Sequence, residues 1–158
     1  MLEFEHIVQI NDPDDGNIKP LTRVQLWEGL LLRARDPGKF NSAISCRLSE
    51  EHNEGFTRHI QAGDTEFRER VILSLHEKIE TVISGPDQPM QARSITSIEE
   101  PAEGCLFVRF FYCRDMEDTA EGNMIGEHLK SAYLHTDIDA IALIRMLAED
   151  ELLTCRPS

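Results

Sequence analysis

The clearest hydrophobic pattern lies near the C-terminus, over residues 124–153. Apolar residues recur there every three or four positions, the spacing of a helix with one buried face. At 1.5 Å per residue, roughly 28 residues form a helix about 42 Å long, which requires a broad surface to pack against. The predicted buried stripe contains Ile125, Leu129, Ala132, Tyr133, Thr136, Ala140, Leu143, Ile144 and Leu147, widened by Leu134, Ile138, Ile141 and Met146. The predicted exposed edge carries Glu127, Lys130, Asp137, Asp139, Arg145, Glu149 and Asp150.

The rest of the chain is dominated by alternating patterns typical of strands. In Leu2–Asn11, residues Leu2, Phe4, His6, Val8 and Ile10 fall on one face, as in a half-buried strand. Six further strands follow, joined by turns so short that neighbouring strands must be antiparallel. They are predicted at Ala43–Glu51, Phe56–Ala62, Thr65–Leu75, Lys78–Ser84, Gln91–Glu99 and Gly104–Arg114, with turns at Asn53–Gly55, Gly63–Asp64, His76–Glu77, Gly85–Pro89 and Pro101–Glu103.

Two helical segments separate the first strand from the others. Leu21–Ala34 begins with Thr22 as N-cap and Gln25 three residues later, which together make a capping box. Asp36-Pro37 starts a second short turn through Phe40, since proline suits the first helical position. The element order predicts one α+β domain over residues 1–158, in which a curved antiparallel sheet wraps around the long C-terminal helix.

The Gly63-Asp64 turn fixes a register that brings two charged residues together. A two-residue loop of this kind closes a tight hairpin, so Arg58 faces Glu69 across the two strands. Both lie on the apolar face formed by Phe56, Ile60, Phe67, Val71 and Leu73. One interpretation is a charged pair that lines a cavity and orients a polar ligand group, with Phe67 and Val71 beside it. The alternative is an ion pair that only offsets the cost of its own burial, or one that lies in water at the open end of the sheet.

Several other polar residues are candidates for the same cavity. His6 falls on an apolar strand face, where it is either a ligand contact or a hydrogen-bonded core residue. Tyr133 lies on the sheet-facing side of the last helix and offers a hydroxyl group, or else packs in the core. The alternation Leu106, Val108, Phe110, Tyr112 favours Arg109 on the outer face. No nucleotide-binding, hydrolase or metal-binding motif occurs, so we predict neither a cofactor nor a metal.

Composition narrows the classes of partner. The net charge of −13 repels nucleic acid and anionic membranes, and the chain begins with no targeting segment and contains no membrane-length apolar run. Cys46, Cys105, Cys113 and Cys155 show no CxxC spacing, and the second and third lie about 26 Å apart on one predicted strand. We therefore expect a cytoplasmic protein in a reducing compartment. Spare apolar surface on the last helix and at Trp27 would suit a homodimer, which the sequence leaves open.

Three blocks of sequence resemble a known family: FEHIVQIND (Phe4–Asp12), LTRVQLWEGLLLRARDP (Leu21–Pro37) and KSAYLHTDIDAIALIRMLAE (Lys130–Glu149). They are similar to the AtaL-like family within the START/Bet v 1-like (SRPBCC, polyketide cyclase-like) superfamily. The resemblance implies a helix-grip fold, in which a seven-stranded antiparallel sheet holds the C-terminal helix and a cavity lies between them. The superfamily includes lipid and hormone binders, polyketide cyclases, ring-hydroxylase subunits and chaperone activators, so fold does not decide function.

Three functional hypotheses follow. The first is a protein that binds an apolar or aromatic small molecule, with Arg58, Glu69, Tyr133 and His6 at its polar end. The second is a cyclase- or dehydratase-type enzyme with Glu69 or His6 as general acid or base. The third is a protein-interaction module with a vestigial cavity and an acidic docking face. An inward Arg58–Glu69 pair in an open cavity would favour the first two, and a filled interior would favour the third.

Overall fold

The computed structural model describes residues 1–150 and residue 152; the predicted end of the last helix at Leu153 and Cys155 lie outside this part of the chain. The strands form one seven-stranded antiparallel sheet in the order β1-β7-β6-β5-β4-β3-β2. All seven predicted strands are confirmed, although Pro101 belongs to a strand rather than a turn. The strands are β1 (Leu2–Gln9), β2 (Ile44–His52), β3 (Gly55–Ala62), β4 (Thr65–Ser74), β5 (Lys78–Ile83), β6 (Ala92–Ala102) and β7 (Cys105–Arg114).

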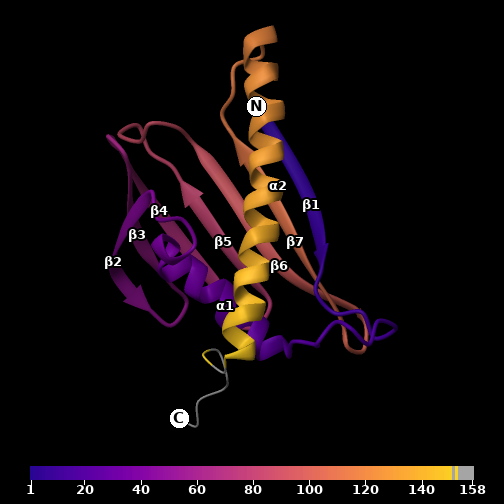
Figure 1. Cartoon of the computed structure of the whole chain (residues 1–158). Helices are drawn as coiled ribbons and strands as arrows, with labels where there is room; N and C mark the ends of the chain where they lie inside the picture. The colour runs from indigo at the N-terminus through magenta and orange to yellow at the C-terminus, as the bar shows by residue number, and fades with distance from the viewer. Residues whose placement is uncertain (151, 153–158) are drawn as a thin grey trace.

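Three helical elements lie on the inner side of this sheet: α1 (Arg23–Arg35), the 3-10 turn η1 (Pro37–Lys39) and α2 (Ala120–Glu149). Figure 1 shows α2 running along the face of the sheet, with α1 beside its C-terminal half. The predicted capping box of α1 is present, because Thr22 accepts from the Gln25 amide and Gln25 returns a bond to the Thr22 amide. No helix in the described residues is long and apolar enough to cross a membrane.

The buried face of α2 differs from the predicted stripe. Asp137 was predicted on the exposed edge, yet its exposed fraction is 0%. Five residues that were predicted to be buried are exposed: Ala132, Thr136, Ile125, Ile138 and Met146, the last three by 49%, 46% and 60%. The first turns of α2 extend beyond the strands in Figure 1, so this part of the helix has less of the sheet to pack against. The residues that are buried on α2 are Gly122, Gly126, Asp137, Ala140, Ile141, Ile144 and Ala148.

The hydrophobic core occupies one end of the space between sheet and helices. It joins the inner faces of α1 and the sheet to the C-terminal half of α2, from Ile141 to Ala148. Its largest fully buried side chains include Trp27 of α1, Phe56 of β3 and Phe110 of β7. The core residues Leu30, Ala34 and Ile79 also line a cavity, which α2 borders through Thr136, beyond the end of this core.

The β3–β4 hairpin has the predicted register. Ala62 pairs with Thr65, Ile60 with Phe67, and Arg58 with Glu69. Gly63 has a φ of +61°, a conformation that glycine adopts without steric cost and that tight hairpin turns require. The turn therefore places Arg58 and Glu69 opposite each other on the inner face of the sheet.

Candidate ligand-binding cavity

A cavity of about 230 Å³ lies between the inner face of the sheet and the helices. One part of its wall is apolar and comes from α1, η1 and strands β2, β3 and β5. Another part carries hydroxyl groups from β5, β6, β7 and α2. The lining residues are Leu30, Arg33, Ala34, Pro37, Phe40, Asn41, Ile44, Arg58, Ile60, Ile79, Thr81, Ser94, Thr96, Tyr112 and Thr136.

The hydroxyl groups form a row because of strand register. Thr81 of β5 pairs with Ser94 of β6, and Ser94 pairs with Tyr112 of β7, so these three side chains project from neighbouring strands to the same face. The Thr81 and Ser94 hydroxyls are hydrogen-bonded to each other. Thr96 lies two residues further along β6 and points to the same side. The sheet thus presents a polar strip on one side of the cavity, opposite in character to the apolar part of its wall.

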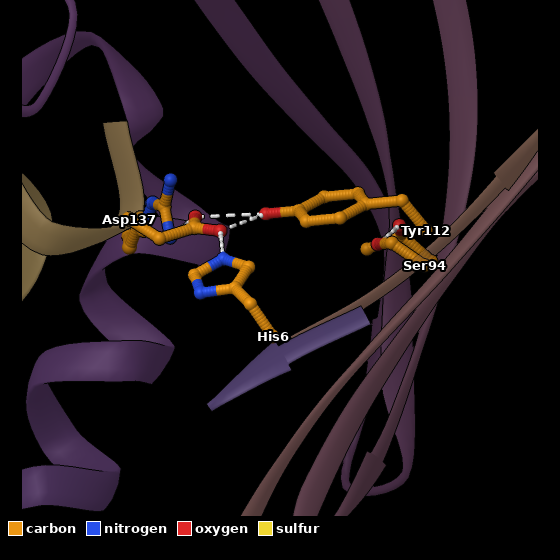
Figure 2. Close-up of polar contacts among 6 residues, drawn as sticks. His6, Ser94, Tyr112 and Asp137 are labelled. Atoms are coloured by element: carbon orange, nitrogen blue, oxygen red, sulfur yellow. Dashed lines mark hydrogen bonds and ion pairs between the residues drawn. The ribbon is translucent and has the colours of Figure 1, made fainter. Parts of the chain in front are cut away.

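A buried carboxylate lies next to this strip. Asp137 on α2 accepts hydrogen bonds from the Tyr112 hydroxyl at 2.6 and 2.7 Å, and its oxygens lie 2.7 Å from His6 Nε2 and 2.8 Å from an Arg33 terminal nitrogen. In Figure 2 the His6 ring and the Tyr112 hydroxyl both point at the Asp137 carboxylate. We call these four residues the Asp137 cluster. It joins β1, β7, α1 and α2 at a single side chain.

The Asp137 cluster is enclosed by aromatic rings and buried groups. His6 is stacked between Phe4 and Phe110, with ring centroids 5.4 and 5.0 Å away. Its Nδ1 atom is buried without a hydrogen-bond partner in the described part of the chain. The other ring nitrogen, Nε2, faces the Asp137 carboxylate, and it donates there because a carboxylate oxygen is an acceptor. Burial and the nearby Asp137 raise the pKa of the Tyr112 phenol well above its usual range, which keeps Tyr112 a donor.

A second charged pair comes from β3 and β4. Arg58 donates from Nε to Glu69, and the two side chains are only 14% and 13% exposed. A terminal nitrogen of Arg58 also donates to the Ala34 carbonyl oxygen at 2.9 Å, near the end of α1. This bond ties the hairpin to the helix that covers it.

The residues predicted as ligand contacts take different places. Arg58 lines the cavity, and Glu69, which does not line it, forms an ion pair with Arg58. Tyr133 stacks on Tyr112 with ring centroids 4.1 Å apart. His6 contacts Asp137 and does not line the cavity. Phe67 and Val71 lie on the same face of the sheet as Arg58, but neither lines the cavity. Val71 packs in the hydrophobic core.

Arg33, Tyr112 and Asp137 were missed as site residues by the sequence interpretation. The sequence does contain a signal that Asp137 is buried, because it lies at helical spacing from apolar residues on one face of α2. Tyr133 lies four residues before it, and Ala140, Ile141 and Ile144 follow it by three, four and seven residues. Arg109 points outward as predicted, where it pairs with Glu5 and Glu99.

A second hollow, of about 370 Å³, lies at the C-terminal end of α2, between Arg145 and the loop before α1. Arg145 there donates to the backbone carbonyl oxygens of Ile10 and Lys19. This hollow is outside the space between sheet and α2. Among the described residues, no group of three or more His, Cys, Asp or Glu side chains is placed to hold a metal ion.

Comparison with known proteins places the chain in a family. The family model AtaL, described as acetylaranotin biosynthesis cluster protein L, matches residues 5–151. The chain belongs to the AtaL family. No curated protein matches its sequence.

Solved structures show the fold that this AtaL-family protein shares. A START superfamily protein from Mycobacterium smegmatis matches with a TM-score of 0.64 at 11% identity, covering 93% of this chain and 99% of that one. Ara h 8.0201 matches with a TM-score of 0.63 at 12% identity, covering 91% and 97%. The di-domain ARO/CYC protein StfQ of the steffimycin biosynthetic pathway matches with a TM-score of 0.65 at 10% identity, covering 96% of this chain but 51% of StfQ. The AtaL-family chain thus has the helix-grip fold of START and Bet v 1-like proteins.

Proposed function

We propose that this protein binds a small apolar or aromatic molecule in the cavity between the sheet and α2. The observation that carries the proposal is the cavity itself, which combines an apolar wall with a strip of hydroxyl groups and two arginines. Ligand sites are commonly apolar hollows with a few convergent polar groups that orient the ligand. Arg58 would contact the ligand directly, whereas Glu69, Tyr133 and His6 would hold the residues that do.

The same geometry favours binding over catalysis by the two predicted bases. Glu69 accepts a hydrogen bond from Arg58, and the Nε2 atom of His6 faces Asp137 rather than the cavity. Asp137 lies within hydrogen-bond distance of three side chains, His6, Arg33 and Tyr112, so its oxygens face these groups rather than a ligand in the cavity. A cyclase- or dehydratase-type reaction would therefore have to use the hydroxyl strip or the arginines as donors.

The protein-interaction hypothesis predicted a filled interior. An open cavity with Arg58 on its wall supports the ligand-binding hypothesis instead. The homodimer stays a prediction, and so does the cytoplasmic location.

The proposal is tested by filling the cavity. Thr136 lines the cavity from α2 but is itself exposed, so Thr136→Trp adds volume at the wall with little disturbance of the core. His135→Trp is the matched control, because His135 is the preceding exposed residue of α2 and does not line the cavity. Binding of a panel of one- and two-ring aromatic compounds is measured by calorimetry for both variants and the unmodified protein.

We expect compounds that bind the unmodified protein to bind His135→Trp equally well and to lose at least tenfold in affinity for Thr136→Trp. Equal binding by all three proteins would place the ligand elsewhere and refute the proposal. So would a panel from which no compound binds the unmodified protein.

A further inference from the structure

The charged groups on the cavity wall are all positive. Arg33 and Arg58 belong to the lining, and no Asp or Glu does so among the described residues. The whole chain contains 29 acidic residues against 16 basic ones. A wall with two arginines and no carboxylate is therefore opposite in sign to the rest of the protein.

The carboxylates that balance these arginines lie outside the lining. Asp137 holds Arg33 from the α2 side, and Glu69 holds Arg58 from β4. Both ion pairs consequently place their cationic member at the cavity. The two cations come from different elements, Arg33 from α1 and Arg58 from β3, and Arg58 reaches α1 through its bond to the carbonyl oxygen of Ala34, the residue after Arg33.

Each guanidinium group keeps hydrogen-bonding capacity. A guanidinium group has five N–H donors. Arg33 contacts Asp137 through one terminal nitrogen, and Arg58 uses Nε and one terminal nitrogen for Glu69 and the Ala34 carbonyl oxygen. The second terminal nitrogen of each arginine has no partner among the described residues, so it is available to a ligand.

The size and the remaining chemistry of the cavity limit the molecule that fits. Its volume of about 230 Å³ is below the roughly 300–1,000 Å³ typical of pockets for drug-sized ligands. A molecule of one or two rings is appropriate to that space. Hydroxyl groups of Thr81, Ser94 and Thr96 can meet further oxygen atoms on one edge of the molecule, while its faces pack on the apolar wall.

We infer that the cavity selects a small organic acid: a one- or two-ring, mainly apolar molecule whose carboxylate is bound by Arg33 and Arg58. Guanidinium groups match the planar, two-oxygen geometry of a carboxylate and form charge-assisted hydrogen bonds to it. This inference rests on the proposed function, because it names the ligand class of the same cavity.

Three probes of matched shape test the sign of the ligand charge: 2-naphthoate, 2-naphthamide and 2-naphthylmethylamine. They are titrated into the full chain by calorimetry at pH 7.5. The acid is expected to bind about tenfold or more tightly than the neutral amide, since hydrogen bonds to charged groups are about twice as strong as neutral ones. The amine is expected to bind most weakly. Equal affinities, or a preference for the amide or the amine, would overturn the acid inference and leave the proposed function in place. Absence of binding by all three probes would count against the proposed function itself.

A paired substitution locates the selectivity. Arg58→Gln/Glu69→Gln removes both charges of the inner ion pair while keeping side chains that can hydrogen-bond, and it should reduce the acid-to-amide preference at least threefold. Arg68→Gln/Asp87→Asn is the control, because it removes an equivalent exposed pair outside the cavity, and its preference should be unchanged. Retention of the full preference by the first double variant would overturn the assignment to Arg58. If that variant does not fold, the order of the three probes on the unmodified protein still decides the inference.

Discussion

The Asp137 cluster makes a strong prediction about stability. Asp137→Asn keeps the shape of the side chain but removes the charge that balances Arg33, and it places an NH2 group where donors from Arg33, Tyr112 and His6 converge. Removing one partner of a buried ion pair costs about 3–5 kcal/mol. The Arg33 side chain is 22% exposed, so it can partly recover contact with water. We therefore expect Asp137→Asn to lower the free energy of unfolding by about 3 kcal/mol, the lower end of this range.

Urea unfolding measures this loss. With an m-value of about 2 kcal/mol per molar urea, a loss of about 3 kcal/mol lowers the midpoint by about 1.5 M. Asp139→Asn is the matched control, because Asp139 is exposed on the same helix two residues away, and its effect should stay within about 0.5 kcal/mol. Equal midpoints for the two variants would refute the view that Asp137 joins the four elements.

A second substitution separates the ion pair from the rest of the Asp137 cluster. Arg33→Gln combined with Asp137→Asn leaves no unbalanced guanidinium group, so the double variant should be more stable than the sum of the single losses predicts, by about 1–3 kcal/mol. Strict additivity would show that Arg33 and Asp137 do not depend on each other.

Further predictions concern packing and titration. Gly29→Ala should destabilise the protein by about 1–3 kcal/mol in urea unfolding despite alanine's higher helix propensity, because its Cβ atom would lie 2.5 Å from the Ile144 side chain. Gly126→Ala should be neutral or stabilising, because the nearest atom to its Cβ would be 3.4 Å away. A greater loss of stability for Gly126→Ala than for Gly29→Ala would contradict this packing. The raised pKa of Tyr112 means that the folded state retains the phenol proton more strongly than the unfolded chain does. The stability that Tyr112 contributes is therefore complete below pH 10, since the usual phenol pKa is about 10, and it declines as the pH rises further. Absorbance titrations of the folded protein and of Tyr112→Phe should coincide up to pH 11. A difference of one ionising phenol between the two titrations would refute the raised pKa of Tyr112. Burial raises the pKa of the Cys46 thiol, so at pH 8 iodoacetamide should modify Cys46 more slowly in the folded than in the urea-unfolded chain, and equal rates by peptide mass spectrometry would be inconsistent with that shift.

The sheet could be predicted from sequence because its signals are local. Strand alternation, short turns and the Gly63-Asp64 hairpin each involve neighbouring residues, and the hairpin register follows from the loop length alone. The Arg58–Glu69 pair was predictable for this reason, since both residues belong to one hairpin.

The members of the Asp137 cluster could not be predicted in the same way, although the spacing of apolar residues around Asp137 places it on the buried face of α2. Asp137 is buried only because donors from three other elements reach it, and those donors, His6, Arg33 and Tyr112, are 131, 104 and 25 residues away in the sequence. The sequence interpretation treated the aspartate as a solvent-exposed residue despite this spacing, so it assigned Asp137 to the wrong face of α2. For His6 the sequence allows a hydrogen-bonded core position, and its bond to Asp137 agrees with that alternative.

The most direct test of ligand binding in this cavity is native mass spectrometry of protein purified gently from its source cells. The unmodified protein and His135→Trp should carry the same small molecule, released and identified after denaturation, and Thr136→Trp should carry little of it. An apo mass for all three proteins, with no stabilisation by aromatic compounds, would contradict the account.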